Sequence, residues 1–280
     1  MAKKKATSKK SVAKTTVKAE KATVKSVKKV ESTAKIASSS VSLLDRISQP
    51  KVLASLAAEF VGTFLLTAII LVSSGQPLAL IFGLMAIVLI VGNVSGAHVN
   101  PLITVGAWAT KRIGHFKMLG YIIAQLLGAM LAFVVLKAFV DAAPAVSQEA
   151  LYYGETAASL FTASKIPAGY EWGILLAELL GSFIFAFAVA HVTADKKHNS
   201  TSVALGVGGG LFVAVMIASS AANMLKGSSI LNPAAAIALQ AFTVKETNTL
   251  WAIAIYVGAA LIGGLAGFGF SELLRKNSEK

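Results

Sequence analysis

The sequence contains no cysteine and few charged residues, and both shortages narrow the possible classes of protein. Without cysteine there is no disulfide framework, no thiolate metal site and no cysteine nucleophile. Only 14% of the 280 residues are charged whereas 55% are hydrophobic, which leaves too little polar surface to cover a soluble domain. We therefore expect a membrane protein.

Most of the net charge lies in the N-terminal segment. Residues 1–46 carry thirteen basic and three acidic side chains, and therefore +10 of the formal net charge of +13. This lysine-rich segment has no aromatic residue, so it cannot bury enough surface to offset chain entropy. We expect residues 1–48 to form a disordered cytoplasmic tail that is attracted to anionic lipid headgroups, with nucleic acid as the less favoured polyanion. Its length before the first apolar run argues against a cleaved secretory signal.

Long apolar stretches begin after Pro50. A hydrocarbon core of about 30 Å takes roughly 20 helical residues to cross. Six stretches have that length, near residues 52–74, 78–96, 118–140, 172–193, 202–222 and 249–271. Two shorter apolar pieces, 101–110 and 233–243, can enter the membrane without crossing it. Because lone half-helices in lipid would leave backbone groups unpaired, we expect them to be buried among the spans.

Charge in the connecting loops predicts the orientation. Basic residues gather in the tail and near 111–117, 196–197 and 275–276, whereas the long loop after the third span is acidic. By the positive-inside rule, both termini of this multi-pass cell-membrane protein are expected to be cytoplasmic. An even number of spans agrees with that orientation.

An internal repeat organises the membrane region. Three landmarks of the first half recur in the same order in the second: residues 58–64 as 177–183, Asn100-Pro101 as Asn232-Pro233, and Tyr121 with Gly128 as Tyr256 with Gly263. Because each half has three spans, the second copy must be inverted relative to the first. We predict an all-α membrane fold of six transmembrane helices and two re-entrant half-helices, an inverted 3+3 repeat with halves at 52–140 and 171–274.

The half-helix starts indicate how such a protein works. Asparagine is a favoured N-cap, and proline is favoured at the first helical position. In an inverted repeat Asn100 and Asn232 meet near the midplane, each with free N–H groups and about half a positive charge of helix dipole. An oxygen-bearing molecule is oriented there, and a cation is repelled.

These motifs together resemble the aquaporin or major intrinsic protein family. Residues 95–108 (SGAHVNPLITVGAW) and 228–239 (SSILNPAAAIAL) resemble its two Asn-Pro-Ala loops, and residues 121–129 and 256–264 resemble its third and sixth spans. The resemblance covers about 52–274. It implies a right-handed six-helix channel domain at 49–274, a short cytoplasmic C-terminus at 275–280, a pore in each subunit and a homotetramer.

The resemblance assigns roles to individual residues. The central constriction comprises Asn100, Pro101, Leu102, Asn232, Pro233 and Ala234. Glu59 and Glu178 match the buried glutamates that hold the re-entrant loops, and an ionisable group within a span is normally paired or functional. His98 matches a loop histidine, for which a packing role is at least as well supported as a pore contact.

Departures from the family pattern bear on selectivity. Leu102 replaces the first motif's alanine, and Ala235 stands where the family has the arginine of its outer filter. The other filter positions are expected at Leu80 or Phe82 in the second span, and at Ser220 and Ser229. Such a filter is small and uncharged. Lys226 precedes the second motif, and a solvated loop lysine is favoured there over a charge at the pore mouth.

The sequence therefore predicts a passive channel for water and small neutral solutes such as glycerol, urea or ammonia. The alternatives are a secondary transporter, which would need an asymmetric ion-coupling site, and a membrane scaffold with a polyanion-binding tail. An enzyme fits worst, because four histidines and few acids form no acid–base constellation. We expect no metal and no cofactor.

Overall fold

A computed structural model describes residues 47–195, 198–245 and 248–278, and within those ranges it contains helices, turns and loops but no strand. The chain divides into two units, Met1–Pro50 and Lys51–Lys280. The second unit contains nearly all of the described residues. The predicted tail at 1–48, with its lipid or nucleic-acid partners, lies outside the described residues except for its last two positions.

Six helices in the described part of the chain are long and apolar enough to cross a membrane. They are α3 (Pro50–Ser73), α4 (Pro77–Ser95), α6 (His115–Ala142), α8 (Glu171–Val192), α9 (Ser200–Met224) and the composite helix Thr249–Ser278. Each overlaps the apolar stretch predicted for it, so the all-α, six-span prediction is confirmed.

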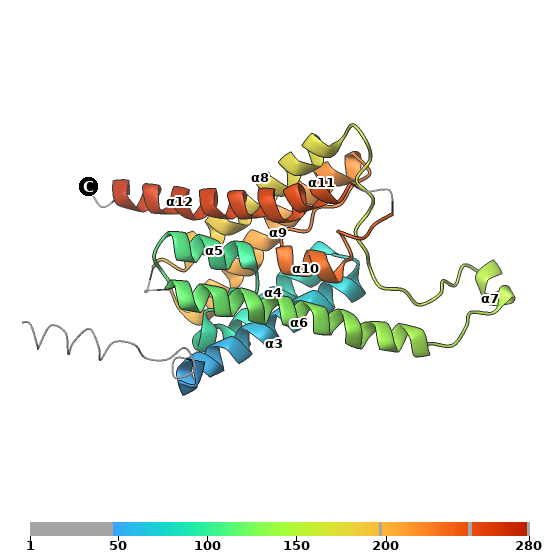
Figure 1. Cartoon of the computed structure of the whole chain (residues 1–280), viewed down its shortest axis with the longest axis horizontal. Coiled ribbons are helices and arrows are strands. Elements are labelled where there is room, and N and C mark those ends of the chain that lie inside the picture. Colours follow the sequence, from blue (N-terminus) through green and yellow to red (C-terminus); the bar gives the residue numbers. More distant parts are fainter. Residues whose placement is uncertain (1–46, 196–197, 246–247, 279–280) are drawn as a thin grey trace, which may run out of the picture. The chain divides into compact units, whose positions relative to one another are not determined.

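The two half-helices lie between the long ones. In Figure 1, α5 (Pro101–Ala109) and α10 (Pro233–Ala238) lie between α12 and α6. At six residues α10 is shorter than predicted, because Gln240 adopts a left-handed φ of 57° and the Ala241 N–H bonds back to the Ala236 carbonyl at 3.0 Å. A short helix in the long loop, α7 (Gln148–Tyr152), was not predicted.

The last span is built from three pieces. It begins as α11 (Thr249–Ile253), widens into the π-helix η1 (Ala254–Ala259) and continues as α12 (Ala260–Ser278), seven residues past the predicted end at 271. A π-turn is rare and often marks a functional position, since it displaces the following side chains from the α-helical register.

Glycine lets the spans of each half approach closely at matched positions. A Cβ on Gly128 of α6 would stand 2.3 Å from the Phe60 carbonyl oxygen of α3, and one on Gly263 of α12 would stand 2.5 Å from the Leu179 oxygen of α8. Small residues at such crossings are typical of helix packing in membranes. The sequence repeat is therefore also a repeat of helix contacts.

Candidate functional site

The two half-helices begin with the same capping arrangement. Asn100 is the N-cap of α5, where its Oδ1 accepts from the Leu102 N–H at 3.0 Å. Asn232 is the N-cap of α10, where its Oδ1 accepts from the N–H groups of Ala234 and Ala235 at 3.0 and 3.3 Å. Both asparagines are almost completely buried. Proline at the first helical position follows each cap and carries no N–H that would need a partner.

The caps bond across the repeat. The Nδ2 group of Asn100 donates to the Leu231 carbonyl at 2.7 Å, and that of Asn232 donates to the Val99 carbonyl at 3.1 Å. The positive ends of α5 and α10 therefore abut, as the sequence predicts. A primary amide has two N–H donors, so each cross-bond leaves one N–H of each asparagine for another acceptor.

The residues before the caps have unusual backbone conformations. Val99 has a φ of 43° and Leu231 a φ of 57°, both in the left-handed region. That region is costly for residues with a side chain, and most of all for a β-branched valine. Such a conformation persists only where its surroundings hold it.

A buried glutamate of each half holds this backbone. Glu59 accepts from the N–H groups of His98 at 2.9 Å and Val99 at 2.7 Å. Glu178 does the same for the second loop, where it accepts from the N–H groups of Ile230 and Leu231 at 2.8 and 2.7 Å and from the Ser229 hydroxyl at 2.8 Å. Val99 and Leu231 are thus each held at the N–H by the glutamate of their own half and at the carbonyl by the asparagine of the other half.

A polar network extends the clamp in the first half. Gln125 Nε2 lies 2.8 Å from both Glu59 Oε2 and Thr104 Oγ1, and His98 Nδ1 lies 3.2 Å from Thr104 Oγ1. The repeat-related positions in the second half are Ala260, Ala236 and Ile230. Sequence reasoning missed Gln125 and Thr104, although the polar-to-apolar mismatch between the repeats marked them. His98 also packs edge-on against Tyr121, with ring centroids 5.3 Å apart.

A cavity of about 290 Å³, the polar cavity, gathers several of the expected filter residues. Leu80, Ser220 and Ser229 line it together with Ser219 and Ser228. Phe82 is not in its lining and is 64% exposed, so this geometry favours Leu80 as the second-span position. Ala235 is also absent from the lining, and it is fully buried in the first turn of α10. Lys226 lies exposed in the turn that ends α9.

The long loop after α6 closes over this region. The Phe161 N–H donates to the Leu71 carbonyl at 3.0 Å, the Ala163 N–H to the Leu239 carbonyl at 2.9 Å, and the Ser164 N–H to the Ser228 hydroxyl at 2.9 Å. Phe161 also lines the polar cavity. Sequence reasoning used this loop only to predict the orientation, because the loop makes these bonds with backbone N–H groups that carry no sequence signature.

Comparison with known proteins agrees with this geometry. Residues 46–271 match the family model described as "Major intrinsic protein". The chain belongs to the major intrinsic protein family. The family consists of channels, not enzymes.

Several relatives and one solved structure resemble the chain over most of its length. It is 32% identical to the glycerol uptake facilitator protein-like 6 of Lactiplantibacillus plantarum, over 74% of this chain and 92% of that one. It is 30% identical to aquaporin Z of Photorhabdus laumondii, over 79% of this chain and 97% of that one. The aquaglyceroporin structure from Plasmodium falciparum has the same fold, with a TM-score of 0.60 at 17% identity over 81% of this chain and 99% of that chain.

The departure of this family member at Leu102 is accommodated by close helix packing. Leu102 is fully buried in the first turn of α5, with Gly264 of α12 beside it. A Cβ at position 264 would stand 2.8 Å from the Leu102 carbonyl oxygen and 3.2 Å from its Cβ. The repeat-related positions are Ala234 of α10 and Ala129 of α6, so the Leu102–Gly264 pair corresponds to an Ala–Ala pair at the other half-helix.

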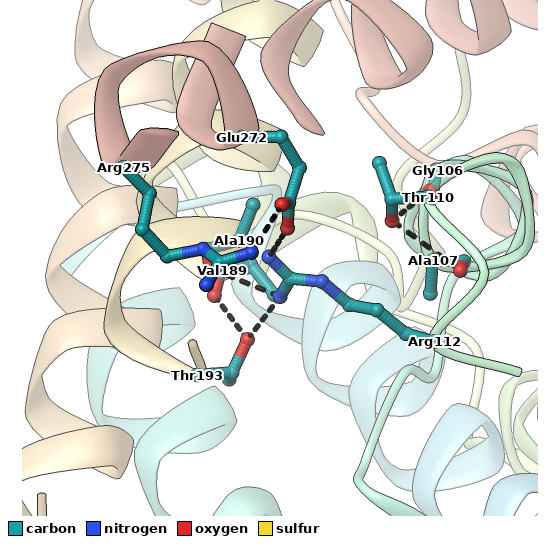
Figure 2. A network of polar contacts seen from close by, with 9 residues as sticks. All are labelled: Gly106, Ala107, Thr110, Arg112, Val189, Ala190, Thr193, Glu272 and Arg275. Atoms are coloured by element: carbon teal, nitrogen blue, oxygen red, sulfur yellow. Dashed lines mark hydrogen bonds and ion pairs between the residues drawn. The ribbon is translucent and has the colours of Figure 1, made fainter. Parts of the chain in front are cut away.

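The far end of α5 is held by an ionic network that sequence reasoning did not predict. Figure 2 shows Arg112, just after α5, between α8 and α12. Its guanidinium donates to Glu272 at 2.8 Å, to the Ala190 carbonyl at 3.0 Å and to the Thr193 hydroxyl at 3.1 Å, and it lies 5.1 Å from the centre of the Phe268 ring. Counted from the capping asparagines, the equivalent position after α10 is Val244, which has no charge.

Proposed function

We propose that this chain is a passive membrane channel for water and small neutral solutes. The observation that carries the proposal is the reciprocal pair of bonds between the Asn100 and Asn232 caps, which holds two positive helix ends together among the spans. A pair of helix dipoles in a low-dielectric setting raises the energy of any cation between them. The remaining asparagine N–H groups supply donors for the oxygen of a neutral permeant.

The proposed solute range includes glycerol, urea and ammonia. The family's filter arginine is replaced by Ala235, and the polar cavity has several serines and no basic residue in its lining. Hydroxyls both donate and accept, and therefore suit polyols and amides as well as water. Similarity to a glycerol uptake facilitator and to aquaporins supports this breadth.

Stopped-flow light scattering on vesicles containing the full chain tests this function. We expect fast, non-saturating entry of water, glycerol and urea, without leak of potassium ions. Water flux without uptake of any of these solutes would refute the broader selectivity. Saturable flux coupled to an ion gradient would instead identify a transporter.

A charge variant tests the electrostatic part of the proposal. Asn100→Asp places a carboxylate between the two positive helix ends and should lower the cation barrier, so that a potassium leak appears. Asn248→Asp, at the exposed N-cap of α11, is the matched control and should leave the vesicles tight to ions. Equal ion tightness in both variants would contradict the proposed dipole barrier.

We further propose that this multi-pass protein forms a homotetramer in the cell membrane. Both termini of each subunit lie in the cytoplasm, and the basic tail lies near anionic lipid. The absence of cysteine makes orientation simple to measure, because any introduced thiol is unique. A membrane-impermeant maleimide should label Glu155→Cys in the long loop of intact cells and should not label Thr201→Cys at the start of α9. The reverse labelling pattern would show that the protein has the opposite orientation in the membrane.

A further inference from the structure

A second cavity, the apolar cavity, lies behind the constriction. It has a volume of about 380 Å³, and all ten residues that line it are apolar. The half-helices contribute two repeat-related pairs, Pro101 with Pro233 and Val105 with Ile237. Because Pro101 and Pro233 directly follow the capping asparagines, the cavity lies at the level where the two half-helices meet.

The surrounding spans repeat the same symmetry. Ile122 and Leu126 of α6 line the cavity opposite Val257 of η1 and Leu261 of α12, and these too are repeat-related pairs. A cavity lined by equivalent residues of both halves straddles the pseudo-two-fold axis. In an inverted repeat that axis runs in the membrane plane, so the cavity is at the bilayer midplane.

The two halves differ at the edge of the cavity. Phe242 and Ile253 line it, whereas their counterparts Thr110 and Met118 do not. Ile253 immediately precedes η1 and Val257 lies within it, so the π-turn shapes this wall. The second half therefore contributes two more lining residues than the first.

The cavity is open on one side. Ile237, in the last turn of α10, is 38% exposed, and Ile253 is 47% exposed. At the midplane the surrounding medium is hydrocarbon, so an uncovered half-helix side chain contacts either acyl chains or a neighbouring protein.

The residues beside the opening favour acyl chains over a neighbouring protein. On α6 the exposed face next to Ile122 and Leu126 carries Leu119, Ile123 and Leu127, each more than half exposed. Surfaces that pack against another transmembrane helix are enriched in small residues, which this face lacks. Large, flexible aliphatic side chains suit contact with lipid.

We propose that the apolar cavity binds the hydrocarbon chain of a membrane lipid. With no polar side chain in its lining it offers nothing to a headgroup or a water molecule, and apolar cavities of this kind stay dry but accept apolar guests. A bound chain packs against Pro101 and Pro233, directly behind the two caps. Its placement at the midplane rests on the proposed membrane channel.

Photo-crosslinking tests the site without reference to transport. The full chain is reconstituted with a phosphatidylcholine that carries a diazirine near the end of one acyl chain, irradiated, and mapped by mass spectrometry. We expect adducts on cavity residues such as Leu126 and Leu261 as well as on the exposed α6 face. Ile237→Trp should fill the opening and remove the cavity adducts while leaving those on the α6 face, and Val257→Phe, from the opposite wall, should do the same.

The matched control is Ile123→Trp, which adds the same bulk on the exposed α6 face and should leave the cavity adducts intact. Adducts on the α6 face with none in the wild-type cavity would overturn the proposal. So would cavity adducts that persist unchanged in both Ile237→Trp and Val257→Phe. Stopped-flow water permeability of the same vesicles reports the proposed function separately, so the absence of cavity adducts from a water-conducting wild-type preparation counts against the lipid site alone.

Discussion

The side-chain amide of Asn100 donates to the carbonyl of Leu231, 2.7 Å away and 131 positions later in the sequence. The same carbonyl belongs to a residue whose N–H is held by Glu178, so one strained peptide segment receives support from both halves of the molecule. The Val99 segment has the mirror arrangement, with Glu59 at its N–H and Asn232 at its carbonyl. The two loops at the constriction therefore support each other, and loss of either glutamate or either asparagine should destabilise both loops.

Replacement of Asn232 by alanine should cost more than the loss of an ordinary helix cap. The variant loses the cap of α10, worth ~1 kcal/mol, and leaves the buried Val99 carbonyl unpaired, worth about 1–3 kcal/mol. Thermal unfolding in detergent should show the combined loss, and water permeability should fall. Asn248→Ala removes an exposed cap of the same type and should cost only ~1 kcal/mol. Equal losses would mean that the cross-bond contributes nothing.

Glu178→Gln should break the second clamp while preserving its size. A glutamine has one acceptor oxygen in place of two, so at least one of the three donors that face Glu178 loses its partner. We expect a loss of about 1–3 kcal/mol in stability and a lower water permeability. The control is Glu149→Gln in the long loop, whose side chain is exposed and should tolerate the change. A variant as stable and permeable as the wild type would remove the clamp from the mechanism.

Sequence patterns predicted the features that depend on local chemistry or on the repeat. Span lengths follow from hydropathy, and the capping of α5 and α10 follows from Asn-Pro, because one residue type satisfies the first free N–H groups of a helix. Inversion follows from an odd number of spans in each half. Together these signals suffice to predict that Asn100 and Asn232 meet.

The features that sequence patterns missed are made by the backbone or by single, unrepeated side chains. The hydrogen bond from the Ala163 N–H to the Leu239 carbonyl joins two main-chain groups, so the residue types at these positions do not predict it. Arg112 aligns with Val244 when counted from the capping asparagines, so the repeat gave no reason to single it out. The early end of α10 depends on Gln240 adopting a left-handed φ, which glutamine rarely does.

Gly264→Ala should disturb the constriction by pushing α12 away from the first turn of α5. The new Cβ would meet the Leu102 carbonyl oxygen at 2.8 Å, so α12 and the first turn of α5 must separate. We expect a loss of roughly 1–3 kcal/mol and reduced water permeability. Because the clash is with backbone, Leu102→Ala should not rescue the variant. The control is Gly269→Ala on the same helix, because an added Cβ there has nothing within 4 Å. If Leu102→Ala did rescue Gly264→Ala, the volume of the Leu102 side chain would determine this contact instead of the backbone.

Arg112→Lys should loosen the other end of α5. The guanidinium reaches Glu272, the Ala190 carbonyl and Thr193 together, which a lysine amine cannot match from one position. The side chains of Arg112 and Glu272 are only 22% and 21% exposed, so the pair is partly desolvated and its loss should cost about 1–3 kcal/mol. Arg275→Lys alters the second, more exposed partner of Glu272 and should cost ~0.5 kcal/mol. If thermal unfolding gives the two variants the same stability, the Arg112 network does not anchor α5, and the half-helix is held by its capped end alone.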